Sequence, residues 1–268
     1  MIGSASRNTD SLILCMEQSP NGAGLKTHPR NSEMTTPKFN LTNENVDWAK
    51  WTWNPVTGCL HKCPYCYARD IANRFNPYKF EPHFWLERLA APHNTKIPKS
   101  KENEPGIRNV FTVSMGDLFG DWVPLSWIEQ IFYIIRKNTQ WNFILLTKNP
   151  KRYAEFNFPP NCWIGATADT QERADIALDV FSRLNVTNIK FLSLEPLSEH
   201  VWLGWYKYRD NMPVFDWLII GGRSKSTGMP AMQPEWEWVE SLLGQARDFS
   251  IPIYFKPNLM VRPKEYPK

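Results

Sequence analysis

Residues Trp51–Phe75 read WTWNPVTGCLHKCPYCYARDIANRF and bring together three of the chain's five cysteines, Cys59, Cys63 and Cys66. Pro64 and two tyrosines interrupt these cysteines, which makes the stretch a poor strand and a poor helix start. Cysteines spaced this closely are more typical of a metal-binding loop than of a disulfide framework. The stretch therefore predicts a metal centre, and the other elements are placed around it.

The composition is that of a single folded domain that stays in solution. The chain has 268 residues, of which 42% are hydrophobic and 22% charged, a length and balance that suit one large α/β barrel. The net charge of +4 is compatible with a nucleic-acid partner without requiring one. No apolar run is long enough for a membrane span, and no secretory signal is present, so we expect a cytoplasmic protein without membrane contact.

The domain organisation follows from where periodic patterns begin. Residues 1–42 contain turn-forming residues and little apolar sequence, so we expect a poorly ordered N-terminal segment. Its Cys15 lies far from the cysteine cluster and is expected to be an ordinary thiol. Residues 43–268 are expected to form the single domain.

Short apolar runs alternate with amphipathic stretches along this domain. Continuous apolar runs are typical of parallel strands covered on both faces, and strand–helix alternation predicts right-handed crossovers. We therefore expect an α/β fold with parallel strands in a closed or partial barrel, with a doubly wound open sheet as the alternative. The expected strands are Trp51–Asn54, Val110–Met115, Asn142–Thr147, Cys162–Ala166, Ile189–Leu194, Asp216–Ile220 and Ile253–Phe255.

Three helices have recognisable sequence signals. Leu125–Lys137 has apolar residues at helical spacing and ends in two basic residues. A second helix is expected to be capped by Asp169, with Glu172 completing a capping box. A third is expected to open at Pro234. The side chains expected to face the core are Ile176, Ala177, Val180 and Leu184 in the second helix, and Trp238, Leu242 and Leu243 in the third.

Polar residues follow almost every predicted strand. The carboxyl ends of parallel strands meet at one edge of a sheet, where ligands of α/β proteins bind. We therefore expect one site there, at the same edge as the cysteine loop. The residues that follow successive strands and would surround this site are Ser114, Gly116, Asp117, Thr147, Lys148, Thr167, Asp169, Ser193, Glu195, Gly221, Gly222, Arg223 and Lys256. Among them, Asp117, Lys148, Glu195, Gly221 and Gly222 are the candidates for cofactor binding.

The cysteine loop by itself allows two kinds of metal centre. Cys59, Cys63 and Cys66 could bind zinc together with His61, although a histidine inside the loop makes a four-ligand cage awkward. The same three thiolates could instead bind a four-iron cluster. In that case one iron has no protein ligand and is open to a substrate or cofactor.

The motifs also carry a family resemblance. Cys-x₃-Cys-x₂-Cys, with Tyr65 before the third cysteine, resembles the signature of the radical S-adenosylmethionine superfamily. The ordered set WNPVTGC, CPYCYA, VSMGDLF, LLTKNP, WIGAT, FLSLEPL and DWLIIGG more closely resembles the phage Gp37/Gp68 family of three-cysteine-motif proteins, a domain of unknown function. These motifs extend from Trp51 to about Lys256.

This resemblance implies a partial (β/α)₆-type radical S-adenosylmethionine barrel with a [4Fe-4S] cluster on the three cysteines. It implies that S-adenosylmethionine binds the open iron and that one electron, from a flavodoxin- or ferredoxin-type donor, cleaves it to a 5′-deoxyadenosyl radical. Tyr65 is expected near the cluster or adenine, and Asp117 at the methionine amino group unless it only caps a turn. Lys148 and Glu195 are expected at the ribose, carboxylate or substrate, with a mutual salt bridge as the alternative. Gly221 and Gly222 are expected at the cofactor unless they only form a tight turn.

One departure from that family concerns the substrate. Arg223 stands where family members commonly have an acidic residue, and a guanidinium can only donate hydrogen bonds. This favours an anionic substrate such as a nucleic acid or nucleotide. Residues Lys62–Lys101, with eight basic and three acidic side chains, agree with it. The alternative is a zinc-binding or structural iron-sulfur phage protein that binds nucleic acid without radical catalysis.

Overall fold

The structure is a computed structural model that describes residues 36–42, 46, 48–204 and 212–261. The chain divides into two compact units, Met1–Thr35 and Thr36–Lys268, and all described residues belong to the second. Cys15 therefore lies outside the described residues. Residues 36–42, expected to be part of the poorly ordered segment, include the buried Phe39 and a short strand, so the folded unit includes residues that precede the expected boundary at residue 43.

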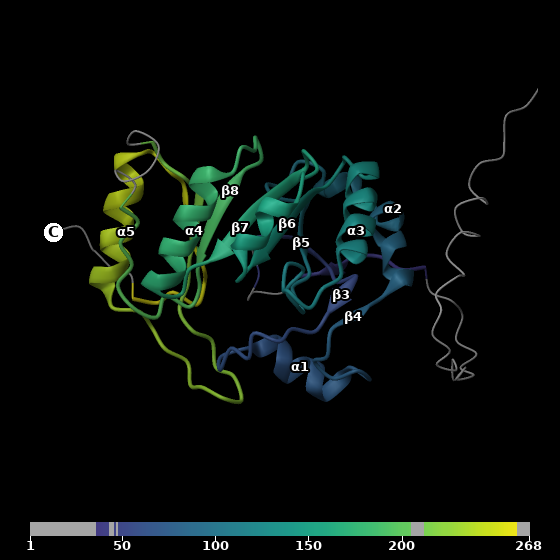
Figure 1. The fold of residues 1–268 in the computed structure, drawn as a ribbon, viewed down its shortest axis with the longest axis horizontal. Coiled ribbons are helices and arrows are strands. Elements are labelled where there is room, and N and C mark those ends of the chain that lie inside the picture. The colour runs from purple at the N-terminus through teal and green to yellow at the C-terminus, as the bar shows by residue number, and fades with distance from the viewer. Residues whose placement is uncertain (1–35, 43–45, 47, 205–211, 262–268) are drawn as a thin grey trace, which may run out of the picture. The chain divides into compact units, whose positions relative to one another are not determined.

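One sheet of eight strands forms the centre of this unit (Figure 1). All neighbouring strands pair in parallel except the first two. In spatial order the strands are β1 (Asn40–Leu41), β2 (Trp51–Trp53), β5 (Asn109–Thr112), β6 (Asn142–Thr147), β7 (Cys162–Thr167), β8 (Lys190–Leu194), β9 (Trp217–Ile220) and β10 (Ile253–Phe255).

The strand order decides between the two expected architectures. The seven parallel strands lie side by side in the order in which they occur along the chain. A doubly wound sheet would reverse direction at a switch point, and no reversal occurs in the described sheet. The α/β class with parallel strands is therefore confirmed. The order runs from β1 at one edge to β10 at the other, as in a partial barrel.

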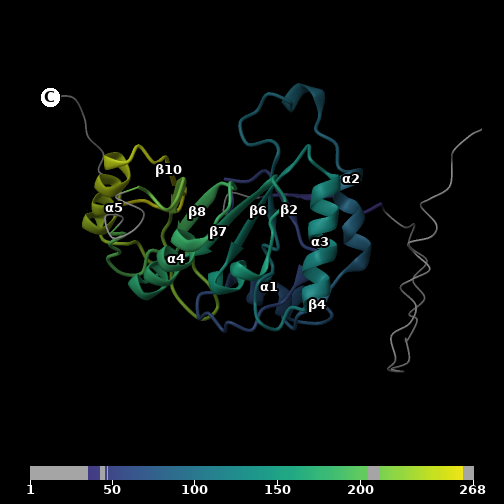
Figure 2. The ribbon, with the colours of Figure 1, turned by 45° about the horizontal axis from the view of Figure 1, so that its top comes forward.

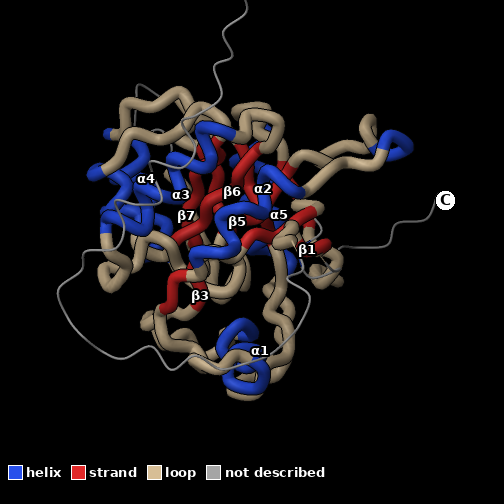
Figure 3. Tube along the Cα trace, turned by 90° about the vertical axis from the view of Figure 1, so that its right-hand side faces the viewer, coloured by secondary structure: helices blue, strands red, loops and turns tan. Residues whose placement is uncertain are grey.

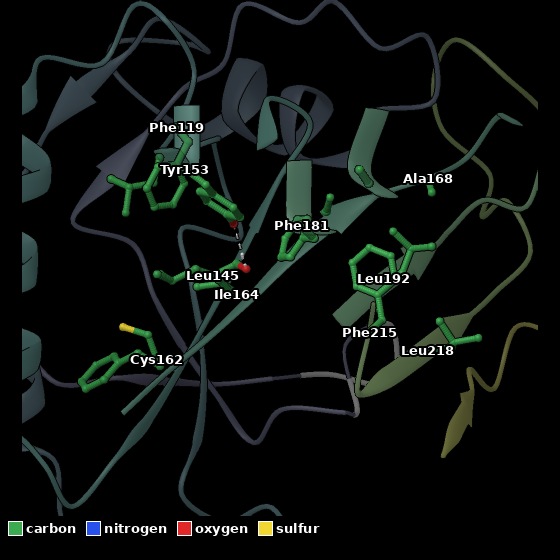
Figure 4. Packing of buried hydrophobic residues seen from close by; sticks show 14 of the residues in the cluster. Phe119, Leu145, Tyr153, Cys162, Ile164, Ala168, Phe181, Leu192, Phe215 and Leu218 are labelled. Carbon is green, nitrogen blue, oxygen red and sulfur yellow. Dashed lines mark hydrogen bonds between the residues drawn. The ribbon is translucent and has the colours of Figure 1, made fainter. Parts of the chain in front are cut away.

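Helices α3 (Leu125–Lys137), α4 (Gln171–Arg183) and α5 (Trp236–Asp248) cover one face of the sheet (Figure 1). The core beneath them is built from alternate strand residues, among them Leu145, Ile164, Leu192 and Leu218 (Figure 4). The buried Tyr153 hydroxyl donates to the Gly165 carbonyl at 2.9 Å, which ties the short helix Pro150–Glu155 to β7.

The other face of the sheet is apolar at one end and polar at the other. Phe111, Ile144, Phe191 and Ile219 form a cluster there with Trp48 of the segment before β2. Because side chains alternate along a strand, the residues two and four positions further on project from the same face. They are Lys148 after Leu146, Ser193 and Glu195 after Phe191, Gly221 after Ile219, and Lys256 after Tyr254.

Helix α3 has the bounds expected from its periodicity, whereas the second helix differs from expectation. Helix α4 begins at Gln171 and is capped by Thr170, whose hydroxyl accepts from the Arg173 N–H at 3.4 Å. The expected cap at Asp169 is wrong, because that carboxylate bonds to other side chains. The buried stripe of α4 is Ala174, Ala177, Leu178 and Phe181. Ala177 and the cap residue Leu184 are buried as expected, while Ile176 and Val180 are only half-buried.

Helix α5 begins at Trp236, two residues after the expected start. Leu242 is buried as expected, but Trp238 and Leu243 are half-buried. Val239 and Ala246 take the inner positions instead, since the helix lies with its smaller side chains against the sheet.

Helix α1 (Tyr67–Phe75) lies apart from α3, α4 and α5, beside the hairpin of β3 (Val56–Thr57) and β4 (His83–Phe84) (Figures 1 and 3). The segment after α2 (Ala91–Asn94) projects from the sheet and contains the short helix Lys99–Lys101 (Figure 2). Within the described residues, no helix is long and apolar enough to cross a membrane.

Candidate active site

The base of the cysteine loop is held between two other segments. The Gly58 N–H donates to the Met115 carbonyl at 2.9 Å, and the Cys59 N–H donates to the Phe80 carbonyl at 3.1 Å. Gly58 has a φ of +89°, and a Cβ there would lie 2.2 Å from the Glu81 carbonyl oxygen. Only glycine fits this position. The backbone at Gly58 therefore defines the direction in which the loop leaves the end of β3.

The end of the loop is the start of α1. Cys66 is the cap residue, and its sulfur accepts from the Arg69 N–H at 3.4 Å. The Arg69 side chain also donates to the Cys63 carbonyl at 2.8 Å. A thiolate at this position is stabilised by the positive end of the helix dipole. The third cysteine is thus held in place by the helix that follows it.

The three thiols lie near one another. Burial is the main cause that raises the pKa of Cys59 to about 12, and Asp117, Cys63 and Cys66 raise it further. Burial also raises the pKa of Cys66, again with a contribution from Cys63. Three half-buried sulfurs in one loop, with raised pKa values for Cys59 and Cys66, are a donor set that a cationic centre would stabilise.

The geometry of the cysteine loop bears on whether the metal centre is a zinc ion or a four-iron cluster. Zinc–sulfur bonds of about 2.3 Å in a tetrahedron require sulfurs roughly 3.8 Å apart, and a four-iron cube is larger. Among the described residues, no three His, Cys, Asp or Glu side chains are grouped so as to hold a metal ion. His61 places Nε2 2.8 Å from Asp117 Oδ2. His61 has a second ring nitrogen, Nδ1, which could bind zinc while Nε2 donates to Asp117, so this pair is compatible with a zinc site as well as with a cluster on the three cysteines.

Asp117 is buried and accepts four hydrogen bonds. Oδ1 accepts from the Thr147 hydroxyl at 2.8 Å and the Phe119 N–H at 3.0 Å, and Oδ2 accepts from the Lys148 N–H at 2.9 Å and from His61. Burial raises the pKa of Asp117, but the His61 contact and these hydrogen bonds together hold it below its ordinary value. A carboxylate has about four acceptor positions, so protein donors use them all. Asp117 links the end of β6 to the cysteine loop and caps a turn.

Tyr65, between the second and third cysteines, contacts the end of β7. Its hydroxyl donates to Asp169, whose carboxylate also accepts from Arg173. The Lys148 ammonium lies 5.4 Å from the centre of the Tyr65 ring. Burial raises the pKa of Asp169, but Lys148, Tyr65 and Arg173 lower it below its usual value. These four side chains join the cysteine loop to two strand ends.

A second group surrounds the ends of β8, β9 and β10. The buried Lys256 ammonium donates to the Glu195 carboxylate, so Glu195 forms its ion pair with Lys256 and not with Lys148, the expected alternative. A Cβ on Gly221 would lie 3.0 Å from Lys256 Cδ and 3.2 Å from Glu195 Cγ. Gly222 is equally confined, since its Cβ would lie 2.9 Å from the Met232 carbonyl. Gly221 therefore leaves room for the ion pair, and Gly222 leaves room for the backbone of Met232 and Asn258.

Two contacts connect this second group with the cysteine loop. Desolvation of the Tyr67 hydroxyl raises its pKa most, although 43% of the residue is exposed, and the nearby charges of Glu195 and Cys66 raise the pKa further. The segment that follows Gly222 reaches the loop, because a Cβ on Gly228 would lie 2.6 Å from the Pro64 carbonyl. The predicted site residues therefore share one edge of the sheet.

Arg173 at this edge was not among the expected residues, and it lies one helical turn beyond Asp169. Asp169 and Lys256 follow their strands as expected, where Asp169 forms an ion pair with Arg173 and Lys256 forms one with Glu195. Arg223, by contrast, donates to the Pro230 carbonyl at 3.0 Å within its own turn. Cys162 is buried and its thiol pKa is raised by burial, as expected for a thiol outside the site.

The fold and this edge define an α/β protein with a three-cysteine loop at the carboxyl ends of its parallel strands. The fold is similar to that of a solved mutant of spore photoproduct lyase, with a TM-score of 0.50 and 10% sequence identity over 84% of this chain and 80% of that chain. The chain belongs to the family described as "Protein of unknown function (DUF5131)", which matches residues 43–261. No curated protein matches the sequence.

Proposed function

We propose that this protein is a radical S-adenosylmethionine enzyme that binds a [4Fe-4S] cluster on Cys59, Cys63 and Cys66. The observation that carries the proposal is the position of these thiols, on a loop that follows the first parallel strand and ends in the cap of α1. The fold similarity to spore photoproduct lyase, itself a radical S-adenosylmethionine enzyme, supports it. The narrower kinship with phage Gp37/Gp68 proteins and a cytoplasmic location belong to the same proposal.

The donor set fits such a cluster. Three thiolates would hold three irons, and the fourth iron would accept the amino and carboxylate groups of S-adenosylmethionine. With both bound, the centre would supply one-electron reductive cleavage of that cofactor, for which a flavodoxin- or ferredoxin-type donor is needed. Tyr65 would hold the loop in place through Asp169, and Asp117 would do so through His61.

Charged groups at the same edge are suited to the rest of the cofactor. The Lys148 ammonium beside Tyr65 would bind a carboxylate, and it lies on the face of the sheet that also presents Glu195. Glu195, with one quarter of its side chain exposed, would accept hydrogen bonds from ribose hydroxyls while Lys256 holds it. Gly221 would act at the cofactor through Lys256 and Glu195, for which it leaves room, and Gly222 would shape the adjoining turn. Asp117 has its acceptors occupied, so its role is to position the loop.

The test is anaerobic reconstitution with iron and sulfide. We expect a brown protein with roughly four irons per chain that converts S-adenosylmethionine to 5′-deoxyadenosine under dithionite. Cys63→Ala should lose the iron, whereas Cys162→Ala should retain it because that thiol lies in the core. Stoichiometric zinc without iron would refute the proposal in favour of a zinc protein. A cluster that never cleaves the cofactor would leave a structural iron-sulfur protein.

A further inference from the structure

Aromatic side chains gather on the surface beside the cysteine loop. Phe75 at the end of α1 is 70% exposed, and Tyr78 is 48% exposed. The Tyr78 ring stacks on the His83 ring with centroids 3.8 Å apart and planes 12° apart, and Trp85 contacts both rings edge-on. We call Phe75, Tyr78, His83 and Trp85 the aromatic surface.

Cations accompany these rings. The Arg74 guanidinium lies 4.9 Å from the centre of the Phe75 ring, and that of Arg88 lies 4.1 Å from the Trp85 ring. Burial lowers the pKa of His83, so its ring is neutral at pH 7 and can stack. Between residues 74 and 88 the chain has three basic side chains, Arg74, Lys79 and Arg88, and two acidic ones, Glu81 and Glu87. The stretch that carries the aromatic surface therefore has a small excess of positive charge.

The aromatic surface is held in one arrangement by hydrogen bonds. The Trp85 indole donates to the Thr57 hydroxyl at 2.8 Å, and the Tyr78 N–H donates to the Asn76 side chain at 3.0 Å. The Trp85 N–H donates to the Pro55 carbonyl at 2.7 Å. Rings that are already ordered lose little entropy when a ligand stacks on them.

An exposed stripe leads from this surface to the cysteine loop. Tyr67, Ile71 and Phe75 are spaced four residues apart along α1, so they lie on one side of the helix. They are 43%, 45% and 70% exposed, whereas Ala68 and Ala72 on another side are buried. The stripe is about 12 Å long at the helical rise of 1.5 Å per residue. It ends at Tyr67, whose hydroxyl donates to the Ser114 carbonyl at 3.2 Å beside the third cysteine.

We propose that α1 and the aromatic surface bind a single-stranded nucleic acid, with bases stacked on Phe75 and Tyr78 and one further nucleotide reaching the cysteine loop along the stripe. Exposed rings flanked by cations are the usual means of binding single strands without sequence preference. A duplex hides its base faces and would use only the charges. Binding of the nucleic acid does not depend on the proposed function. Only a reaction of the nucleotide that reaches the cysteine loop rests on it.

The experiment measures binding by fluorescence anisotropy with the full chain. The probes are a labelled single-stranded DNA of about 12 nucleotides, an RNA of the same sequence, and the DNA paired with its complement. We expect single strands to bind more tightly than the duplex. Phe75→Ala and Tyr78→Ala should each weaken single-strand binding about tenfold. The double variant Arg74→Gln with Lys79→Gln should lower the slope of log affinity against log salt by about 1.4.

A matched control comes from another helix. Tyr133 on α3 is 52% exposed and lies under the Lys137 ammonium at 5.6 Å, but it has no neighbouring ring array among the described contacts. Tyr133→Ala and Lys137→Gln should leave binding unchanged. The substituted aromatic and charged side chains are all exposed, so the variants should fold.

The outcomes separate this inference from the proposed function. Ring-dependent binding by a chain that holds no iron would support the inference and refute the proposed function. Cofactor cleavage with no oligonucleotide binding would overturn the inference alone. Equal affinity for duplex and single strand, unchanged in Phe75→Ala, would overturn the inference, because it would mean that the protein binds phosphates by charge without stacking bases on its rings. Binding of an acidic flavodoxin in place of the oligonucleotides, with the same residues required, would overturn it in favour of a protein partner.

Discussion

Replacing Asp117 by Asn tests whether this carboxylate positions the cysteine loop or binds the cofactor. Its two oxygens accept four hydrogen bonds in a buried position. Asparagine keeps one acceptor oxygen, so two donors lose their partner. His61 can shift its proton to Nδ1 and accept from the new amide, but the backbone N–H of Lys148 has no such choice.

The expected cost follows from these contacts. Hydrogen bonds to charged groups contribute about 1.5–3 kcal/mol each. One bond is lost in Asp117→Asn and another is weakened, so we expect the free energy of unfolding to fall by about 3 kcal/mol. The unfolding entropy of a unit of this size is about 0.5 kcal/mol/K, so the unfolding temperature should fall by about 6 °C.

The assay is thermal unfolding of the cofactor-free protein followed by circular dichroism. The pKa of Asp117 is lowered in the folded state, so its contribution is present above the unfolded pKa and is lost as the pH falls through the folded pKa. The difference in unfolding temperature between wild type and Asp117→Asn should therefore be constant near pH 7 and shrink below about pH 4. Asp121→Asn is the control, because this exposed carboxylate accepts from the Asn149 amide at 2.7 Å on the surface and should change stability by less than about 0.5 kcal/mol.

An unchanged unfolding temperature for Asp117→Asn would refute this reasoning. If that variant also bound S-adenosylmethionine more weakly with its iron content intact, Asp117 would be a cofactor ligand, as the family resemblance implies. Loss of iron together with stability is the result we expect from a residue that holds the loop.

Three further substitutions test other contacts. Gly58→Ala should lower the free energy of unfolding by more than about 2 kcal/mol and lower the iron content, because the φ of Gly58 is +89° and a Cβ would overlap a carbonyl. The control is Gly244→Ala, which should be neutral or stabilising in the same unfolding assay, because Gly244 lies in a helix with open space around it. Glu195→Gln should lower the free energy of unfolding by about 3 kcal/mol, because it removes the carboxylate that pairs with the buried Lys256. Glu195→Gln combined with Lys256→Met should recover part of that loss in urea unfolding, and a double variant that loses the sum of the two single losses would show that the pair is not coupled. Tyr65→Phe removes the bond to the carboxylate at the end of β7 and should cost about 1–3 kcal/mol, with faster loss of iron to a chelator; unchanged chelation kinetics would contradict a role in holding the loop.

Local patterns explain which elements could be predicted. The strands Asn142–Thr147 and Ile253–Phe255 and the helix Leu125–Lys137 have the bounds that the sequence indicated, since apolar periodicity and dipole-matched ends are properties of neighbouring residues. The edge at which the predicted site residues meet followed from strand direction alone. The sequence did not show which side of α4 faces the sheet. Both the alanines and the branched side chains of this helix could face inward, and the packing of the sheet decides between them.

The sequence by itself determined the three-cysteine loop, the parallel class of the strands and the set of polar residues that end them. Only the tertiary structure decided how those residues pair. Asp117 meets His61 across 56 positions, Tyr65 meets Asp169 across 104, and Glu195 meets Lys256 across 61. Partners so distant in sequence leave no local pattern, because their contact depends on the crossovers that bring the strand ends together.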